Sequence, residues 1–324
     1  MKKKVLSGMR PTGRLHLGHY FGALKNWVEL QNEYECYYMS ADWHALTTDY
    51  ADTSKVNDNT LDMVADWITA GVDPEKSVIF KQSKVPQHSE LFLILSMVTP
   101  LGWLFRVPTY KEQLTELKGK DLHNYGFLGY PVLQAADILL YMADIVPVGE
   151  DQLAHLELTR EVARRFNNFY GNVLIEPQAK LTKSARVSGI DARKMSKSYG
   201  NSIFLGENDD SMKKKVQEMF TDPLKIKKDD PGHPEGCVVF AFHKIFNGNC
   251  HERESECKAG SVGCVLCKKQ LMEMLSVFMK PLADKRNDLM RDKSYLEKII
   301  EQGTEKAKEQ ASSSMSEIRK ALKF

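Results

Sequence analysis

The sequence predicts an α/β protein in which a Rossmann-type parallel sheet with nucleotide-binding signatures is followed by an all-helical C-terminal domain. Short apolar runs alternate with helical periodicity over residues 3–166, polar residues follow several of these runs, and no further strand pattern occurs beyond residue 209. Strands separated by helices form parallel sheets, which bind ligands at the carboxyl ends of their strands. We therefore expect a Rossmann-type domain over residues 1–203 and a helical domain over residues 204–324.

Length and composition bound the possibilities without choosing a function. The chain has 324 residues, of which 42% are hydrophobic and 27% charged, which is enough for two domains with cores. The formal net charge is only +2, so a nucleic-acid partner would need a local basic face. No apolar run approaches membrane-spanning length, and residues 1–4 precede only a short apolar patch. We therefore expect no signal peptide, no membrane anchor and a cytoplasmic location.

The N-terminal stretch has the pattern of a nucleotide-binding opening. It predicts a strand over residues 3–7, a turn over residues 11–13 and a helix over residues 15–30. Unpaired amides and the positive end of the helix dipole face a ligand at such a turn. His16 and His19 lie three residues apart, so both imidazoles can face one site, and Gly18 leaves room for a base or ribose. Two exposed histidines in a first helical turn would be the alternative.

Further elements place polar residues on one rim of the sheet. Strands are expected over residues 35–40, 77–81 and 145–149, and helices over residues 53–70, 89–97, 130–141 and 150–166. Gly8, Arg10, His44 and Gln82 follow directly on predicted strands, so we expect them to gather at the carboxyl edge. Residues 99–129 are rich in Gly and Pro and predict an irregular insertion.

The segment over residues 130–141 combines an apolar surface with three aligned polar side chains. Pro131 suits the first position of a helix, and apolar residues around most of its girth predict that the helix is buried. Tyr130, Gln134 and Asp137 fall on one face of it. A ligand that offers an ammonium or an N–H would supply the partners that these groups need. Alternatively, Asp137 caps or pairs within the core.

Residues 191–201 predict a mobile loop suited to a polyphosphate. Arg193, Lys194 and Lys197 lie among small, turn-forming residues, with Arg186 shortly before them. Ammonium groups can neutralise charge that moves between phosphate oxygens, while hydroxyls and backbone N–H groups supply further donors. A solvated basic loop is the alternative. Helical periodicity follows over residues 209–220, 268–291 and 294–323.

Five of the six cysteines crowd into one stretch of the helical domain, which indicates a metal site in a protein without an export signal. Cys257, Cys264 and Cys267 have the spacing C-x6-C-x2-C, with Cys237 and Cys250 upstream. Thiolates at such spacing can enclose a tetrahedral zinc ion or an iron–sulfur cluster, and spacing alone does not choose. Scattered free cysteines would be the alternative.

In this order, the motifs resemble those of the class I aminoacyl-tRNA synthetases. Residues 16–19 are similar to the first signature of that family and residues 194–198 to the second. Residues 8–13, 146–152 and 155–167 resemble the tryptophan-specific branch, and the likeness covers essentially the whole chain. The resemblance implies a tryptophan–tRNA ligase that forms tryptophanyl-adenylate and pyrophosphate from ATP and then transfers L-tryptophan to tRNA(Trp). It also implies Mg²⁺ and a homodimer.

The resemblance further implies roles for individual residues. Asp137 accepts the indole N–H, and Tyr130 and Gln152 hold the ammonium group of tryptophan, in a pocket shared with Gln134 and His44. The residues implied to bind ATP are Arg10, Pro11, Thr12, Gly18, His19, Gly149, Glu150, Asp151, Val187, Lys194, Met195, Ser196, Lys197 and Ser198. The residues implied in catalysis and pyrophosphate handling are His16, His19, Lys111, Lys194 and Lys197.

Two departures from the family pattern keep alternatives open. Gln134 stands where many tryptophan enzymes have Met, and with Tyr130 and Asp137 it resembles a tyrosine-binding set, so a tyrosyl-tRNA synthetase is the alternative. His19 stands where tryptophan enzymes often have Asn. A ligand-sensing iron–sulfur regulator and a small-molecule nucleotidyltransferase are more distant alternatives.

The cysteine spacing resembles that of some bacterial members of the tryptophan branch, which carry a 4Fe-4S cluster near the anticodon site. By this resemblance Cys237, Cys257, Cys264 and Cys267 are the implied ligands, with Zn²⁺ as the alternative metal. Cys250 is then the spare thiol.

Overall fold

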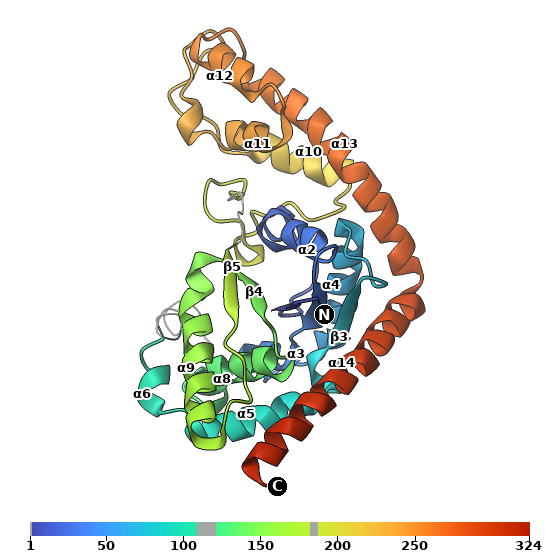
Figure 1. Cartoon of the computed structure of the whole chain (residues 1–324). Coiled ribbons are helices and arrows are strands. Elements are labelled where there is room, and N and C mark those ends of the chain that lie inside the picture. The colour runs from blue at the N-terminus through green and yellow to red at the C-terminus, as the bar shows by residue number, and fades with distance from the viewer. Residues whose placement is uncertain (1, 108–109, 111–120, 182–186) are drawn as a thin grey trace.

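The centre of the fold is a five-stranded parallel sheet (Figure 1). The computed structural model describes residues 2–107, 110, 121–181 and 187–324. Its strands are β1 (Lys4–Met9), β2 (Glu35–Ser40), β3 (Ser77–Lys81), β4 (Ile145–Val148) and β5 (Gln178–Leu181). They lie in the order β3-β2-β1-β4-β5, so the direction of winding reverses between β1 and β4. The predicted α/β class with a parallel sheet is therefore confirmed, and the reversal marks where a ligand is expected.

Helices cover both faces of the sheet and make up the C-terminal part (Figure 1). The first are α1 (Leu17–His19), the π-helical turn η1 (Tyr20–Leu24), α2 (Lys25–Leu30), α3 (Asp42–Asp49), α4 (Val56–Ala70), α5 (Gln87–Val98), α6 (Leu101–Leu104), α8 (Tyr125–Leu140) and α9 (Leu153–Tyr170). The later ones are α10 (Asp209–Glu218), α11 (Val238–Phe246), α12 (Cys250–Lys258), α13 (Cys264–Arg291) and α14 (Lys293–Leu322). Short 3-10 turns are η2 (Gln82–Lys84), η3 (Glu150–Gln152), η4 (Lys197–Tyr199) and η5 (Pro234–Gly236). Among the described residues, no helix has the length and apolar character needed to cross a membrane.

The sheet separates two hydrophobic cores, because neighbouring side chains along a strand point to opposite faces. On one face, Val5 and Tyr38 pack with side chains of α2, α4 and α13. On the other, Leu6 and Met39 pack with side chains of α5, α8, α9 and α14. Both faces of each inner strand are thus covered, which explains why each of these strands contains successive buried apolar residues.

The start of α8 differs from the sequence-based expectation. The helix begins at Tyr125, because the side chain of Asn124 accepts the backbone N–H of Phe127 at 2.9 Å and caps it. Pro131 therefore lies inside α8, and the prediction that it occupies the first helical position is wrong. The expected irregular insertion over residues 99–129 contains α6 and this first part of α8 among its described residues.

Several short elements are not predicted by the sequence pattern. The pattern predicts no strand where β5 lies, because this strand is at the edge of the sheet, paired with β4, and its side chains are partly exposed. It also fails to predict α3, α11 and α12. α12 has no buried residue and therefore lacks the apolar stripe that marks a helix in a sequence.

α13 and α14 join the C-terminal lobe to the sheet. α14 runs back along the α/β part and covers the edge strand β3 (Figure 1). A Cβ atom at Gly303 would lie 1.9 Å from the carbonyl oxygen of Ile79, so only glycine allows this approach. The helix thereby shields an edge of the sheet from pairing with another chain.

Candidate active site

A cavity of about 410 Å³ lies where the sheet changes direction, and we call it the switch-point cavity. The ends of β1 and β4 line it, together with side chains from α3 and α8. The predicted site residues in its lining are Arg10, His44, Tyr130, Gln134, Asp137, Gly149 and Gln152. A cavity of this size suits a small ligand. The structure therefore brings the strand-end residues and the polar face of α8 together.

His16 and His19 form a close pair at the start of α1. Their ring centroids lie 3.8 Å apart, and Nδ1 of His19 accepts the backbone N–H of His16 at 3.3 Å. Burial, with the nearby charge of Lys197, lowers the pKa of His16 to about 4. Burial also lowers the pKa of His19 to about 3, and the neighbouring His16 and Lys197 add to this effect. Both imidazoles are therefore neutral near pH 7 and act as hydrogen-bonding groups.

The second signature meets the first through Lys197. Its ammonium group donates to the carbonyl oxygens of Thr12 at 2.9 Å and Gly13 at 3.1 Å. Met195 is buried, and its Cβ lies 3.7 Å from where a Cβ atom of Gly18 would stand. Burial lowers the pKa of Lys197 to about 8, although nearby carboxylates partly oppose the shift. The loop of the second signature thus lies against the N-terminal segment that contains the first signature.

Hydrogen bonds tie down the loop that carries the second signature. The side-chain oxygen of Asn201 accepts the backbone N–H of Ser196 at 2.8 Å, and its amide donates to Asp191 at 2.7 Å. Just beyond the loop, the carbonyl oxygen of Ile203 accepts the backbone N–H of Leu17 at 2.9 Å. The end of the loop is therefore attached to the first signature.

The other residues predicted to bind ATP differ in their exposure. Those with exposed side chains are Thr12, Glu150, Asp151, Lys194 and Ser198, and those that are buried are Pro11 and Val187. Arg10 is half-buried, donates to the hydroxyl of Thr48 and forms an ion pair with Asp49 at 3.4 Å. Lys111 and Arg186 lie outside the described residues. The exposed side chains are accessible to a ligand, whereas those of Pro11 and Val187 are not.

Asp137 lies in the wall of the switch-point cavity with both carboxylate oxygens engaged. Oδ1 lies 2.7 Å from Nδ1 of His88 and accepts from Gln82 at 2.8 Å. Oδ2 lies 2.8 Å from Nε2 of His44 and accepts from Gln82 at 2.9 Å. Burial alone would raise the pKa of this carboxyl group, but His88 and His44 outweigh burial and lower it. These contacts fill the roughly four acceptor positions of a carboxylate.

Two residues of this region are missed by the sequence patterns. His88 is fully buried, and its Nε2 lies 2.9 Å from the hydroxyl of Tyr141. His155 is also buried, and its Nε2 lies 2.9 Å from the hydroxyl of Tyr130. Gln82, in contrast, lies directly after β3 at the carboxyl edge, as predicted. Neither histidine has a sequence neighbour that indicates its partner.

The four predicted metal ligands line one small cavity in the C-terminal lobe. Cys237, Cys257, Cys264 and Cys267 surround about 20 Å³, and Cys250 is not in its lining. Burial raises the pKa of Cys237 and Cys257, and it raises the pKa of Cys267 to about 12. Within the described part of the chain, no three Cys, His, Asp or Glu side chains converge closely enough to hold a single metal ion.

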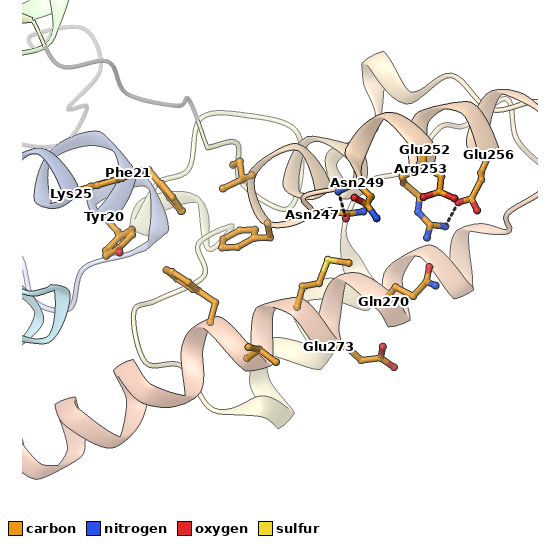
Figure 2. Close-up of a pocket in the computed structure, with 15 residues that line it drawn as sticks. Tyr20, Phe21, Lys25, Asn247, Asn249, Glu252, Arg253, Glu256, Gln270 and Glu273 are labelled. Carbon is orange, nitrogen blue, oxygen red and sulfur yellow. Dashed lines mark hydrogen bonds and ion pairs between the residues drawn. The ribbon is translucent and has the colours of Figure 1, made fainter.

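A larger cavity, of about 960 Å³, lies between η1 and the C-terminal lobe (Figure 2). Tyr20 and Phe21 line its side on η1, and polar side chains such as Asn247, Arg253 and Glu273 line the side of the lobe. Its lining contains none of the residues predicted to bind tryptophan or ATP, whereas several of them line the switch-point cavity. The switch-point cavity is therefore the candidate active site.

Comparison with known proteins identifies the family to which the chain belongs. The family of class I tRNA synthetases for tryptophan and tyrosine (W and Y) matches residues 1–280. The chain belongs to this family. The tryptophan–tRNA ligase of Thermotoga maritima is 50% identical over 325 residues, which cover 98% of each chain. That of Aquifex aeolicus is 41% identical over 391 residues, which cover 98% of this chain and 99% of the relative.

Solved structures agree with the assignment of this chain to the class I synthetases. The tryptophanyl-tRNA synthetase of Campylobacter jejuni, complexed with ADP and tryptophan, has a TM-score of 0.90 and 36% identity, covering 99% of this chain and 100% of that one. A tyrosyl-tRNA synthetase from Archaeoglobus fulgidus, at 18% identity and a TM-score of 0.67, shares the fold. The prediction of a class I synthetase of the tryptophan branch is therefore confirmed.

Proposed function

We propose that this class I synthetase is a tryptophan–tRNA ligase, which activates L-tryptophan with ATP and transfers it to tRNA(Trp). The observation that carries the proposal is the contact between the two signature segments, in which Lys197 is bonded to Thr12 and Gly13. The switch-point cavity, lined by the residues predicted to bind tryptophan, supports it. In the first step, the carboxylate of tryptophan attacks the α-phosphate of ATP and pyrophosphate leaves. In the second, a hydroxyl of the terminal ribose of tRNA attacks the acyl carbon and AMP leaves.

The residues around ATP act by positioning and charge stabilisation, since neither step needs a covalent bond to a side chain. Lys194 and Lys197 supply positive charge to the departing pyrophosphate. The neutral His16 and His19 supply hydrogen bonds at the first signature, and Mg²⁺ enters with ATP as part of the substrate. The phosphates of ATP would take over Lys197 from Thr12, to which it is bonded through both the carbonyl and the hydroxyl.

We infer that the indole N–H binds Oδ2 of Asp137 in place of His44. His44 lines the cavity and its side chain is 12% exposed, whereas the side chain of His88 is fully buried. His44 is thus the partner of Asp137 that can move without opening the core. Tyr130 and Gln152 lie in the same cavity and would hold the ammonium group. An amino acid without an N–H at this position would leave His44 in place and meet a smaller pocket.

Amino-acid-dependent exchange of pyrophosphate into ATP tests the proposed function. We expect exchange with L-tryptophan, and at least about a hundredfold slower exchange with L-tyrosine at equal concentration, because a phenol does not supply the indole N–H. Comparable exchange with tyrosine would favour the tyrosyl-tRNA synthetase alternative. Exchange with neither amino acid would contradict the proposal.

The division of labour along the chain is also a proposal. Residues 1–203 would carry the chemistry, and residues 204–324 would contact the anticodon side of tRNA(Trp), with the protein acting in the cytoplasm. Clustered lysines supply positive charge for the phosphates of tRNA on this second part: Lys213, Lys214, Lys215, Lys225, Lys227, Lys228, Lys268 and Lys269.

We propose that Cys237, Cys257, Cys264 and Cys267 hold a 4Fe-4S cluster. Their shared cavity supports this donor set, since four thiolates at one place match such a cluster. Zn²⁺ is the alternative metal, because four thiolates can also bind zinc tetrahedrally. Arg253 lines the same cavity, and its charge partly opposes the burial that raises the pKa of Cys267.

The proposed cluster would join three helices of the lobe. Cys237 precedes α11, Cys257 lies on the last turn of α12, and Cys264 and Cys267 lie on the first turn of α13. When bound, the cluster would supply four covalent links that fix these helices relative to one another. Gly232 makes room for this arrangement, because a Cβ atom there would stand 2.5 Å from Sγ of Cys257.

Anaerobic purification of matched variants tests the cluster. The native protein should be brown, with absorbance at about 400 nm and bound iron and sulfide. Cys264→Ser should lose this absorbance, while Cys250→Ser should keep it. A colourless protein that contains zinc would favour the alternative metal, and equal loss in both variants would contradict the ligand set.

A further inference from the structure

A buried network of charges joins α13 to the first signature. Arg286 on α13 is 8% exposed, and its guanidinium donates to Asp66 at 2.7 Å and to Asp62 at 2.6 Å. Asp66 on α4 is fully buried. Its second oxygen accepts the backbone N–H of Leu15 at 2.5 Å. One carboxylate therefore connects a C-terminal helix to the residue directly before His16.

The backbone around His16 is held from its other side by the segment that follows the second signature. The carbonyl oxygen of Leu15 accepts the backbone N–H of Leu205 at 2.9 Å, and the N–H of Leu17 donates to Ile203 at 2.9 Å. Asp66 is thus the side chain that completes the support of Leu15. A rotation of the peptide group at Leu15 would turn the ring of His16 away from the site.

α13 touches the first-signature segment a second time. Phe278 lies edge-on to Tyr20, with ring centroids 5.4 Å apart, and it also faces Phe21 at 6.2 Å. Tyr20 and Phe21 follow directly on His19 and point toward the C-terminal lobe (Figure 2). This contact holds α13 against η1. It therefore helps to fix the position of the Arg286 guanidinium relative to Asp62 and Asp66 on α4.

The charges of the network suit a positioning role. A buried ion pair is weak evidence of net stabilisation, because removing two charges from water offsets their attraction. Its directional hydrogen bonds nevertheless fix geometry, and a bidentate guanidinium orients the carboxylates that it contacts. In this protein, the hydrogen bonds fix the backbone of Leu15, which directly precedes His16 of the first signature.

We propose that Arg286 and Asp66 are positioning residues for adenylate formation, which orient the backbone at Leu15 and thereby the ring of His16 against ATP. The proposal rests on the synthetase activity proposed above. Neither residue lines the switch-point cavity. We therefore expect the binding of tryptophan to be independent of the ion pair between Arg286 and Asp66.

The test uses full-length variants in the pyrophosphate exchange assay, with separate measurement of kcat and of KM for each substrate. Arg286→Met should lower kcat at least tenfold and change KM for tryptophan less than twofold, because only the ATP side loses its support. Asp66→Asn should act in the same direction. The double variant should be no slower than the slower single variant within about twofold, since both changes break one unit. Arg286→Lys keeps the charge and should restore part of kcat.

Arg319→Met is the matched control, because Arg319 on α14 makes a similar two-nitrogen ion pair with Glu90 far from the signatures. It should keep kcat within twofold of the native protein. A folded Arg286→Met protein with native kcat, multiplicative effects in the double variant, or an equal loss in the control would overturn the proposal. If Arg286→Met does not fold, Arg286→Lys and Asp66→Asn decide by the same criteria. Absence of exchange in the native protein would instead overturn the proposed function.

Discussion

Lys197 shows how burial sets the pH range over which a single side chain is charged. The pKa of its ammonium group lies at about 8, because burial lowers it while Asp66 and Asp62 partly oppose the shift. His16 and His19 are neutral above about pH 4 and pH 3, so they add no charge to the site near neutrality. Part of the positive charge that would meet pyrophosphate therefore comes from a lysine that titrates close to physiological pH.

We expect kcat/KM for ATP in pyrophosphate exchange to fall as the pH rises through about 8, because the useful form of Lys197 is the protonated one. The activity is present below this pKa and lost above it. Lys197→Arg, whose charge persists at all accessible pH values, should show no such decline up to about pH 10. The same alkaline limb in both proteins would assign the titration to another group.

The candidate site was predictable from the sequence only where its residues are close neighbours or follow predicted strands. Tyr130, Gln134 and Asp137 share one face of α8, and helical spacing alone reveals this alignment. His88 lies 49 residues from Asp137, its buried partner, and no local pattern connects them. Helical spacing therefore predicted the carboxylate, and the strand ends predicted His44 and Gln82, but neither pattern predicted His88.

At the scale of elements, the strands that helices cover on both faces of the sheet were the ones that the sequence predicted. β1 to β4 each contain successive apolar residues because helices cover both faces of the sheet, and each of these strands is predicted. β5 lies at an edge with partly exposed side chains, and it resembles a connector in the sequence. The start of α8 depends on the cap at Asn124, which a pattern of apolar residues does not contain.

The contact between α14 and β3 gives a prediction about one glycine. Gly303→Ala should destabilise the protein by about 1–3 kcal/mol, because its Cβ atom would overlap the carbonyl oxygen of Ile79 and force the helix outward. Thermal unfolding should show a Tm lowered by several degrees. Gly102→Ala, in α6 with no atom near its Cβ position, is the control and should keep the native Tm. An unchanged Tm for Gly303→Ala would mean that α14 packs less closely than described.

At the scale of the whole molecule, the active site depends on contacts between segments that lie far apart in the sequence. Lys197 reaches Thr12 across 185 positions of sequence, and Arg286 reaches Asp66 across 220. Periodicity carries no information about such contacts. The meeting of the two signatures was predictable from the likeness to class I synthetases, whereas the link from Arg286 required the structure.

Exposed apolar side chains on α5 and α6 point to an association of two copies, as the family resemblance implies. Leu93 and Met97 lie one helical turn apart on α5 and are 57% and 73% exposed, and Leu101 on α6 is 59% exposed. Large exposed patches of this kind mark interfaces in soluble proteins. We therefore expect the native chain of 36.9 kDa to have about twice this mass in solution.

Met97→Lys should convert this dimer into a monomer, because a buried, unpaired ammonium group would oppose the apolar interface. Light scattering coupled to size-exclusion chromatography measures the mass directly. Val277→Lys is the matched control, since Val277 is 78% exposed but lies on α13, away from α5 and α6. A dimer that survives Met97→Lys, or one that dissociates equally in the control, would place the interface elsewhere. A shift to the monomer in Met97→Lys alone would locate it on the side of the α/β part that carries α5 and α6, and leave the C-terminal lobe free for tRNA.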